Sequence, residues 1–155
     1  MSAGPATLAP VVRIHDHPSR ISAVVWNALL DEQRAPTPFM RHEYLLALHE
    51  SSSAAPDTGW VPQLLSLEND GRLQAACVVY LKSHSYGEYV FDWAWADAYQ
   101  RHGLRYYPKL LCAVPFTPVP GSRLLARDAD SRRLLLRAMR QLCQNGELSS
   151  AHLLF

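Results

Sequence analysis

The residues best suited to chemistry gather in the stretch YLKSHSYGEYVFDWAWADAY, residues 80–99. Lys82, His84 and Tyr86 alternate, so on a strand they would share one face. Two aspartates follow, one on each side of a pair of tryptophans. A carboxylate or an imidazole beside aromatic walls can have its pKa moved toward neutrality and can then transfer protons. The stretch indicates either a proton-transfer site or a structural segment, in which the aromatic residues are core and Asp92 caps a helix.

Other polar patterns favour structural roles. The motif HDHP, residues 15–18, supplies half of a metal site, but no second cluster of histidine or cysteine completes it. A basic stripe on the last long helical segment is typical of a solvated face more than of a phosphate site. Its members are Arg133, Arg137 and Arg140. The three cysteines fall in apolar segments and predict buried thiols in a reducing compartment. We therefore expect no metal site.

Composition sets the broad class of the protein. A chain of 155 residues with 48% hydrophobic residues fits one globular domain. The formal net charge of +1 gives no electrostatic reason to bind DNA or an anionic membrane. No apolar run reaches the length of a membrane span, and no secretory signal is recognisable, so the sequence favours a cytoplasmic location.

The first part of the chain predicts an arm followed by two helices. Residues 1–18 contain three prolines and no periodicity, which indicates a flexible arm with room for a short strand at residues 11–14. Apolar residues at helical spacing over residues 21–29 predict a helix, with Ser19 as its N-cap. Helical spacing resumes over residues 39–48 and ends at a polar loop.

The rest of the chain alternates strands and helices. Two strand-like segments flank the dipeptide Asp70-Gly71 and predict a hairpin. Residues 91–103 return to helical spacing, with Asp92 as a cap, and Gly103 as a stop. Further segments read as two short strands, the clearest helix of the chain and a last strand: KLLCAVPF, SRLLA, DADSRRLLLRAMRQLCQNG and SAHLLF. This order predicts a mixed, layered α/β fold over residues 19–155.

Three of these segments resemble one bacterial family. They are PFMRHEYLLALHES (38–51), GRLQAACVVYLKSHSYGEYVFDWAWADAY (71–99) and YYPKLLCAVPFTPVPGSRLL (106–125). The chain resembles FemAB-like proteins of the GNAT acyltransferase superfamily, often described as peptidoglycan biosynthesis or recognition proteins. The resemblance implies a GNAT-like mixed sheet with helices on both faces. Family members are longer and carry a second GNAT-like unit, so it also implies an incomplete N-terminal half domain, whose last strand is an edge through which copies could pair.

The resemblance implies an acyl- or aminoacyltransferase that acts on an amine of a small molecule or a peptidoglycan precursor. The alternative is a non-catalytic scaffold or a module that recognises a glycan or peptide. The superfamily's Gln/Arg-x-x-Gly-x-Gly/Ala turn, which holds acyl-CoA pyrophosphate, does not occur here. We therefore expect no cofactor in this chain, whereas the full-length protein would use acyl-CoA or aminoacyl-tRNA.

Local chemistry, not the family, selects the candidate site residues. The catalytic candidates are His84 and Asp92, either of which could act as the base. The candidate substrate contacts are Tyr86, Asp97, Tyr99, Tyr107 and Lys109.

The proline-rich run AVPFTPVPG, residues 113–121, follows a predicted strand. Strands of a GNAT-like sheet splay apart to admit the acyl donor, and prolines would end the strand pairing at that point. The run therefore predicts either the rim of a cleft or a rigid turn between two strands with no ligand nearby.

Overall fold

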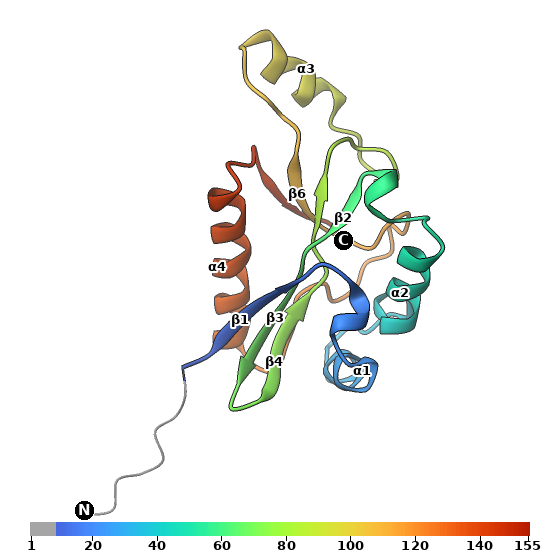
Figure 1. Cartoon of the computed structure of the whole chain (residues 1–155), viewed down its shortest axis with the longest axis vertical. Coiled ribbons are helices and arrows are strands. Elements are labelled where there is room, and N and C mark those ends of the chain that lie inside the picture. Colours follow the sequence, from blue (N-terminus) through green and yellow to red (C-terminus); the bar gives the residue numbers. More distant parts are fainter. Residues whose placement is uncertain (1–8) are drawn as a thin grey trace, which may run out of the picture.

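The computed structural model describes residues 9–155, which form two four-stranded sheets with helices on both sides (Figure 1). The first sheet has the order β1-β3-β4-β7 and is antiparallel throughout. Its strands are β1 (Val11–His15), β3 (Leu64–Asn69), β4 (Arg72–Cys77) and β7 (Leu125–Ala126). The second has the order β2-β5-β6-β8, in which only β6 and β8 are parallel. Its strands are β2 (Trp60–Pro62), β5 (Tyr80–Lys82), β6 (Lys109–Cys112) and β8 (Ala151–Leu153). The predicted mixed α/β class is confirmed.

One long hairpin connects the two sheets. Its first arm is β2 followed by β3, and its second arm is β4 followed by β5. Between the two strands of each arm the pairing is held by a hydrogen bond, which Gln63 N donates to Val79 O at 2.7 Å. Asp70 and Gly71 have φ angles of 50° and 72°, as a two-residue hairpin turn of this hand requires. The hairpin predicted around this dipeptide is confirmed.

Side chains alternate along the hairpin into two cores. Leu64, Ala76 and Val78 face one core, which α1 (Ala23–Asp31) and α2 (His42–Glu50) complete. Leu65, Ala75 and Cys77 face the other core, which α4 (Ala129–Asn145) covers with Leu135 and Met139. Both faces of the sheet are therefore buried, and the strands read as continuous apolar runs for that reason.

The start of the chain differs from prediction in its helix boundary. Ser19 belongs to a short 3-10 turn, Pro18–Arg20, and the helix begins at Ala23 after Ser22, so Ser19 as N-cap is wrong. Pro18 favours this turn because its ring fixes φ and removes a donor at the first position. Within the arm expected over residues 1–18, residues 11–15 form β1 and pair with β3, while residues 1–8 lie outside the described residues.

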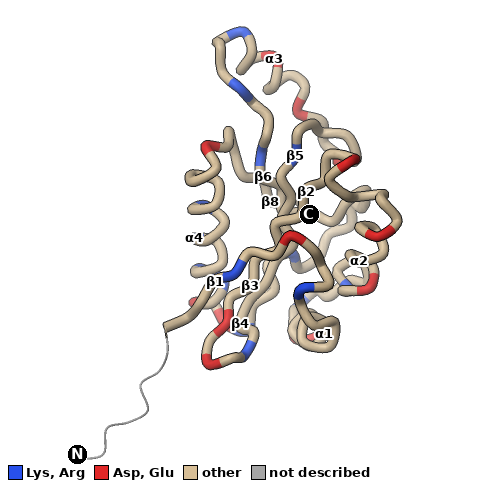
Figure 2. The backbone as a smooth tube through the Cα atoms, viewed as in Figure 1, with Lys and Arg blue, Asp and Glu red and all other residues tan. Residues whose placement is uncertain are grey.

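The third helix projects away from both cores. Helix α3 (Trp93–Arg101) buries none of its side chains and stands out from the sheets (Figure 1 and Figure 2). Its start and its stop before Gly103 are as predicted. The alternative that its aromatic residues form core is wrong, since Trp93 and Trp95 are 58% and 66% exposed. No helix within residues 9–155 is both long and apolar enough to cross a membrane.

The proline-rich run packs between two other segments. Strand β6 ends at Cys112, and Phe116 N then donates to Gly87 O at 3.0 Å. Further on, Gly121 N donates to Phe155 O at 3.1 Å. Gly87 has a φ angle of 81°, and a methyl group there would lie 2.5 Å from the Phe116 ring. Gly87 is therefore required both for its backbone angle and for close contact with the run.

We predict that Gly87→Ala lowers the free energy of unfolding by about 2–4 kcal/mol, because the new methyl group collides with Phe116 and with Trp60. Gly103→Ala is the matched control, since Gly103 also has a positive φ but no neighbour within 4 Å of the added carbon. It should cost only about 1 kcal/mol from backbone strain. Urea unfolding measures both, and equal losses would contradict the close contact.

Candidate functional site

Two lysines are buried opposite each other in the second sheet. Lys82 of β5 pairs with Lys109 of β6, so both side chains leave the same face. Both residues are 0% exposed. Lysine is almost never fully buried without a partner, because removing an ammonium group from water is costly. The neighbouring groups must therefore compensate two positive charges.

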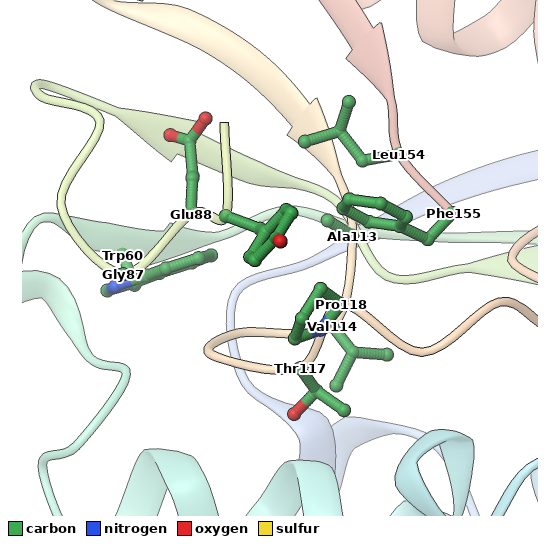
Figure 3. Close-up of a pocket in the computed structure, with 10 residues that line it drawn as sticks. Trp60, Gly87, Glu88, Ala113, Val114, Thr117, Pro118, Leu154 and Phe155 are labelled. Carbon is green, nitrogen blue, oxygen red and sulfur yellow. The ribbon is translucent and has the colours of Figure 1, made fainter. Parts of the chain in front are cut away.

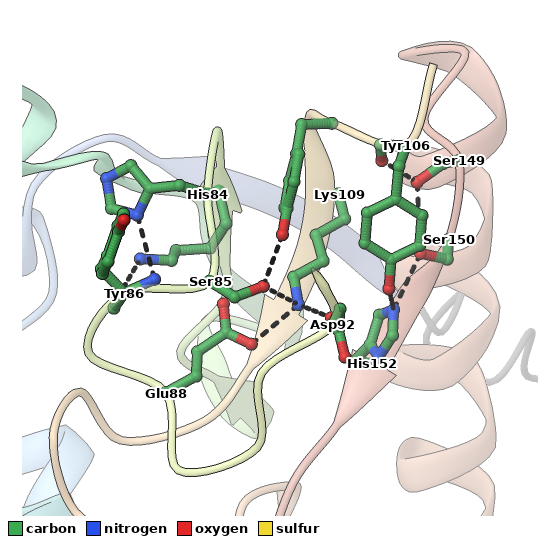
Figure 4. A network of polar contacts seen from close by, with 12 residues as sticks. His84, Ser85, Tyr86, Glu88, Asp92, Tyr106, Lys109, Ser149, Ser150 and His152 are labelled. Atoms are coloured by element: carbon green, nitrogen blue, oxygen red, sulfur yellow. Dashed lines mark hydrogen bonds and ion pairs between the residues drawn. The ribbon is translucent and has the colours of Figure 1, made fainter. Parts of the chain in front are cut away.

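The loop of residues 83–92 supplies the partners of Lys109 (Figure 4). Lys109 Nζ donates to Glu88 Oε2 at 2.7 Å, to Ser85 Oγ at 3.4 Å and to Asp92 Oδ2. Ser85 Oγ also lies 2.6 Å from Tyr107 Oη. The side chains of Glu88 and Asp92 are only 1% and 11% exposed, so these ion pairs lie largely out of solvent. One ammonium group thus anchors both ends of the loop.

The positive charge of Lys82 has fewer compensating partners than that of Lys109. Lys82 Nζ donates to Tyr86 O at 2.9 Å and lies 3.5 Å from the centre of the Trp60 ring, a cation–π contact. The pKa of Lys82 is lowered to about 8, chiefly by burial, while the charge of Glu88 opposes the shift and that of Lys109 adds to it. Lys82 is therefore a buried amine that titrates close to neutral pH.

The two carboxylates on Lys109 are shifted in opposite directions. Burial raises the pKa of Glu88 and outweighs the hydrogen bond and charge of Lys109. Burial also acts to raise the pKa of Asp92, but hydrogen bonds from Lys109 and Tyr106 and the charge of Lys109 together lower it. Glu88 Oε1 is buried and has no hydrogen-bond partner among residues 9–155. A pair of carboxyl groups whose pKa values are pushed apart is typical of acid–base sites.

The polar network continues to strand β8. Tyr106 contacts His152 Nε2 at 3.5 Å, and Ser150 Oγ lies 2.8 Å from the same nitrogen. Burial lowers the pKa of His152, and the charge of Lys109 adds to this, against the pull of Asp92. His152 is therefore held as a neutral hydrogen-bonding group next to Asp92.

Glu88 also belongs to two adjoining hollows. A narrow inner hollow of ≈ 10 Å³ lies among Trp60, Thr117 and Phe155 (Figure 3). An outer depression of ≈ 270 Å³ includes Phe116. Both are lined by Gly87, Glu88, Tyr89 and Pro118. The inner hollow is large enough for about one water molecule. Residues of the proline-rich run line both hollows.

The structure brings together some of the predicted site residues. Asp92, Lys109 and Tyr107 meet in the network around Ser85. Asp92 does not cap α3 through its side chain, because that side chain binds Lys109 instead.

The other predicted site residues lie apart from the Lys109 network. His84 Nδ1 accepts from Tyr86 N at 3.2 Å, and burial lowers the pKa of His84, helped by the charge of Lys82. Tyr86 contributes its carbonyl to Lys82, while its side chain is exposed. Asp97 is exposed and pairs with Arg101. Tyr99 only packs its ring against Tyr106, with centroids 5.1 Å apart.

Sequence reasoning missed Lys82, Ser85 and Glu88 as members of one cluster. Lys82 was expected on the same face as His84, but its burial against Trp60 depends on strand pairing. The available signal was the position of Lys82 two residues after Tyr80 in a strand-like run, because residues i and i+2 of a strand share a face. Among residues 9–155 no group of three or more His, Cys, Asp or Glu residues could hold a metal ion.

Comparison with known proteins gives one match. The model of the FemAB-like family, described as peptidoglycan biosynthesis/recognition, matches residues 17–155. No curated protein and no solved structure matches the chain.

We predict that Lys109→Met lowers the free energy of unfolding by about 3–5 kcal/mol, because it leaves Glu88 and Asp92 buried without their cation. Arg101→Met removes an exposed partner of Asp97 and should cost at most about 1 kcal/mol. Adding Glu88→Gln and Asp92→Asn to Lys109→Met should recover much of the loss. Denaturant unfolding of these variants tests this, and a loss for Lys109→Met no larger than for Arg101→Met would disprove the buried pairing.

The depressed pKa of Lys82 also predicts a pH dependence. Below about pH 8 the folded protein must bury a charged amine. Between that pH and the ordinary value of 10.5 the unfolded chain binds more protons, so stability rises with pH. The stability of the wild type relative to Lys82→Met should therefore increase by about 1–2 kcal/mol from pH 7 to about pH 9.5. A difference between the two proteins that stays constant with pH would contradict the shifted pKa.

Proposed function

The chain belongs to the FemAB-like family of peptidoglycan biosynthesis/recognition proteins, and from this membership we propose that it takes part in transferring an acyl or aminoacyl group to an amine of a peptidoglycan precursor. The environment of Glu88 is the observation that supports this proposal most directly. It has a raised pKa and one unpartnered oxygen, and it lines both hollows beside the proline-rich run.

The sheet arrangement supports a GNAT-type acyltransferase. The second arm of the long hairpin pairs first with β7 and then with β6, so two different strands neighbour one continuous segment. Strand β6 stops at Cys112, and the proline-rich run leaves the sheet before β7 begins. Such a break between neighbouring strands is where the acyl donor would enter under this proposal.

The proposed chemistry needs a proton acceptor for the incoming amine. The acceptor ammonium gives a proton to the Glu88 carboxylate, and the free amine then attacks the carbonyl carbon of an activated ester or thioester. A new N–C bond forms, the C–O or C–S bond breaks, and the second proton that the nitrogen loses goes to the leaving oxygen or sulfur. In this step Glu88 exchanges its contact with Lys109 for the acceptor, while Lys109 keeps Asp92. Of the two carboxylates, Glu88 suits the base better than Asp92, whose pKa is lowered.

We predict that Glu88→Gln lowers the rate of acyl transfer to an amine about 100-fold or more, because the amide cannot take up the proton. Glu50→Gln makes the same chemical change at an exposed helix end and should leave the rate unchanged. The assay uses acetyl-CoA and aminoacyl-tRNA as donors and a muropeptide as acceptor. Full activity of a folded Glu88→Gln protein would refute Glu88 as the base, and no transfer with either donor would refute the activity.

A second candidate function is recognition without catalysis, and the exposed aromatic residues favour it. Phe91 and Trp93 stack with ring centroids 4.9 Å apart, and Tyr86 and Trp95 are exposed nearby in the sequence. Flat aromatic faces of this kind can bind sugar rings or peptide side chains.

If this second function is correct, Trp93→Ala should weaken muropeptide binding about tenfold while leaving stability unchanged, since Trp93 is 58% exposed. Isothermal titration calorimetry measures the binding. Leu136→Ala on α4 is a control for loss of an exposed apolar side chain elsewhere. Muropeptide binding that is unchanged by Trp93→Ala would show that these aromatic residues are not the binding surface.

A further inference from the structure

An arginine is buried with most of its donors unused. Arg123 lies just before β7 and is only 4% exposed. Its Nη2 donates to Val119 O, but Nε and Nη1 are buried and have no hydrogen-bond partner in the described part of the chain. A guanidinium group stays charged in proteins, so burying it with these donors unpaired is costly. None of the ion pairs formed within residues 9–155 includes Arg123.

A third buried polar atom without a partner among the described residues belongs to Thr37, whose side chain lies near Gly121, as does that of Arg123. Thr37 Oγ1 is buried and also lacks a partner within residues 9–155. Gly121 stands between the two side chains. A methyl group on Gly121 would lie 2.5 Å from Thr37 Cγ2 and 3.2 Å from Arg123 Nη1. The side chains of Thr37 and Arg123 therefore both lie close to Gly121, where a larger residue would collide with them.

This region borders a cavity with positive lining. The cavity has a volume of ≈ 350 Å³ and is lined by Arg123 and by Arg132 of the first turn of α4, with no acidic residue in its wall. Asp128, the N-cap of α4, does not line the cavity, and its carboxylate accepts from Ser131 N at 2.7 Å and from Ser131 Oγ at 3.0 Å. Two arginines thus line a cavity that no Asp or Glu side chain lines.

We propose that this cavity binds a phosphate group, with Arg123 as the buried ligand and Arg132 at the rim. The N–H groups of a guanidinium match the oxygens of phosphate in geometry. Two guanidinium groups balance both charges of a phosphate dianion, whereas a carboxylate ligand would supply only one negative charge. The volume leaves room for part of the molecule that carries the phosphate. The site uses none of the residues of the Lys109 network, so it stands independently of the proposed acyl transfer.

The test is a titration of the whole chain with inorganic phosphate, at constant ionic strength set with chloride, followed by thermal unfolding. The melting temperature of the wild type should rise and saturate with phosphate, because a ligand bound to the folded state stabilises it. Acetate, which carries one charge, should bind at least about tenfold more weakly. Arg123→Met should weaken phosphate binding about tenfold or more, and Arg132→Gln by about three- to tenfold.

Arg140→Gln is the matched control, because it removes an exposed charge from the same helix outside the cavity and should change binding less than about twofold. Arg132→Gln keeps the test valid if Arg123→Met fails to fold, since Arg132 is exposed. A melting temperature that does not respond to phosphate would overturn the proposal. So would equal responses of wild type, Arg132→Gln and Arg140→Gln, or acetate binding as tightly as phosphate.

Discussion

The burial of two lysines at one cross-strand position constrains the rest of the site. Lys82 and Lys109 leave the same face of adjacent strands, and neither reaches solvent. Two ammonium groups in that position repel each other and lose their hydration, so the fold is stable only if acceptors close over them. The loop of residues 83–92 does this by giving Lys82 a carbonyl and Lys109 two carboxylates. The loop's conformation therefore follows from the charges beneath it.

The ion pairs with Lys109 determine where the two carboxylates of the loop lie. Asp92 gives its side chain to Lys109 and leaves the start of α3 without a side-chain cap, and the tryptophans of α3 are exposed. Glu88 pairs with the same cation through Oε2 and keeps Oε1 without a partner within the described residues. One lysine thus pairs with two carboxylates whose pKa values differ, because burial raises that of Glu88 while hydrogen bonds and the charge of Lys109 lower that of Asp92. That difference links the fold to the proposed proton transfer.

Much of the fold, and less of the site, could be predicted from the sequence. Asp70-Gly71 marked the hairpin and acidic residues marked the start of α4, because both signals are local. The helix at Ala23 begins later than predicted, since Pro18 forms a separate turn. Asp92 and Lys109 were expected in one site and do meet. Glu88 was missed, because its partner is 21 residues away and the contact depends on the β5–β6 register, which no local pattern specifies.

The central claim is that one buried lysine pairs with two carboxylates whose pKa values are shifted in opposite directions. Carbon-13 NMR of the side-chain carboxyl groups, recorded through a pH titration, measures this directly. Glu88 should titrate above the ordinary glutamate value of 4.5 and Asp92 below the ordinary aspartate value of 3.8. Titration of both groups at their ordinary values would mean that Lys109 and its loop are solvated, and would contradict the account.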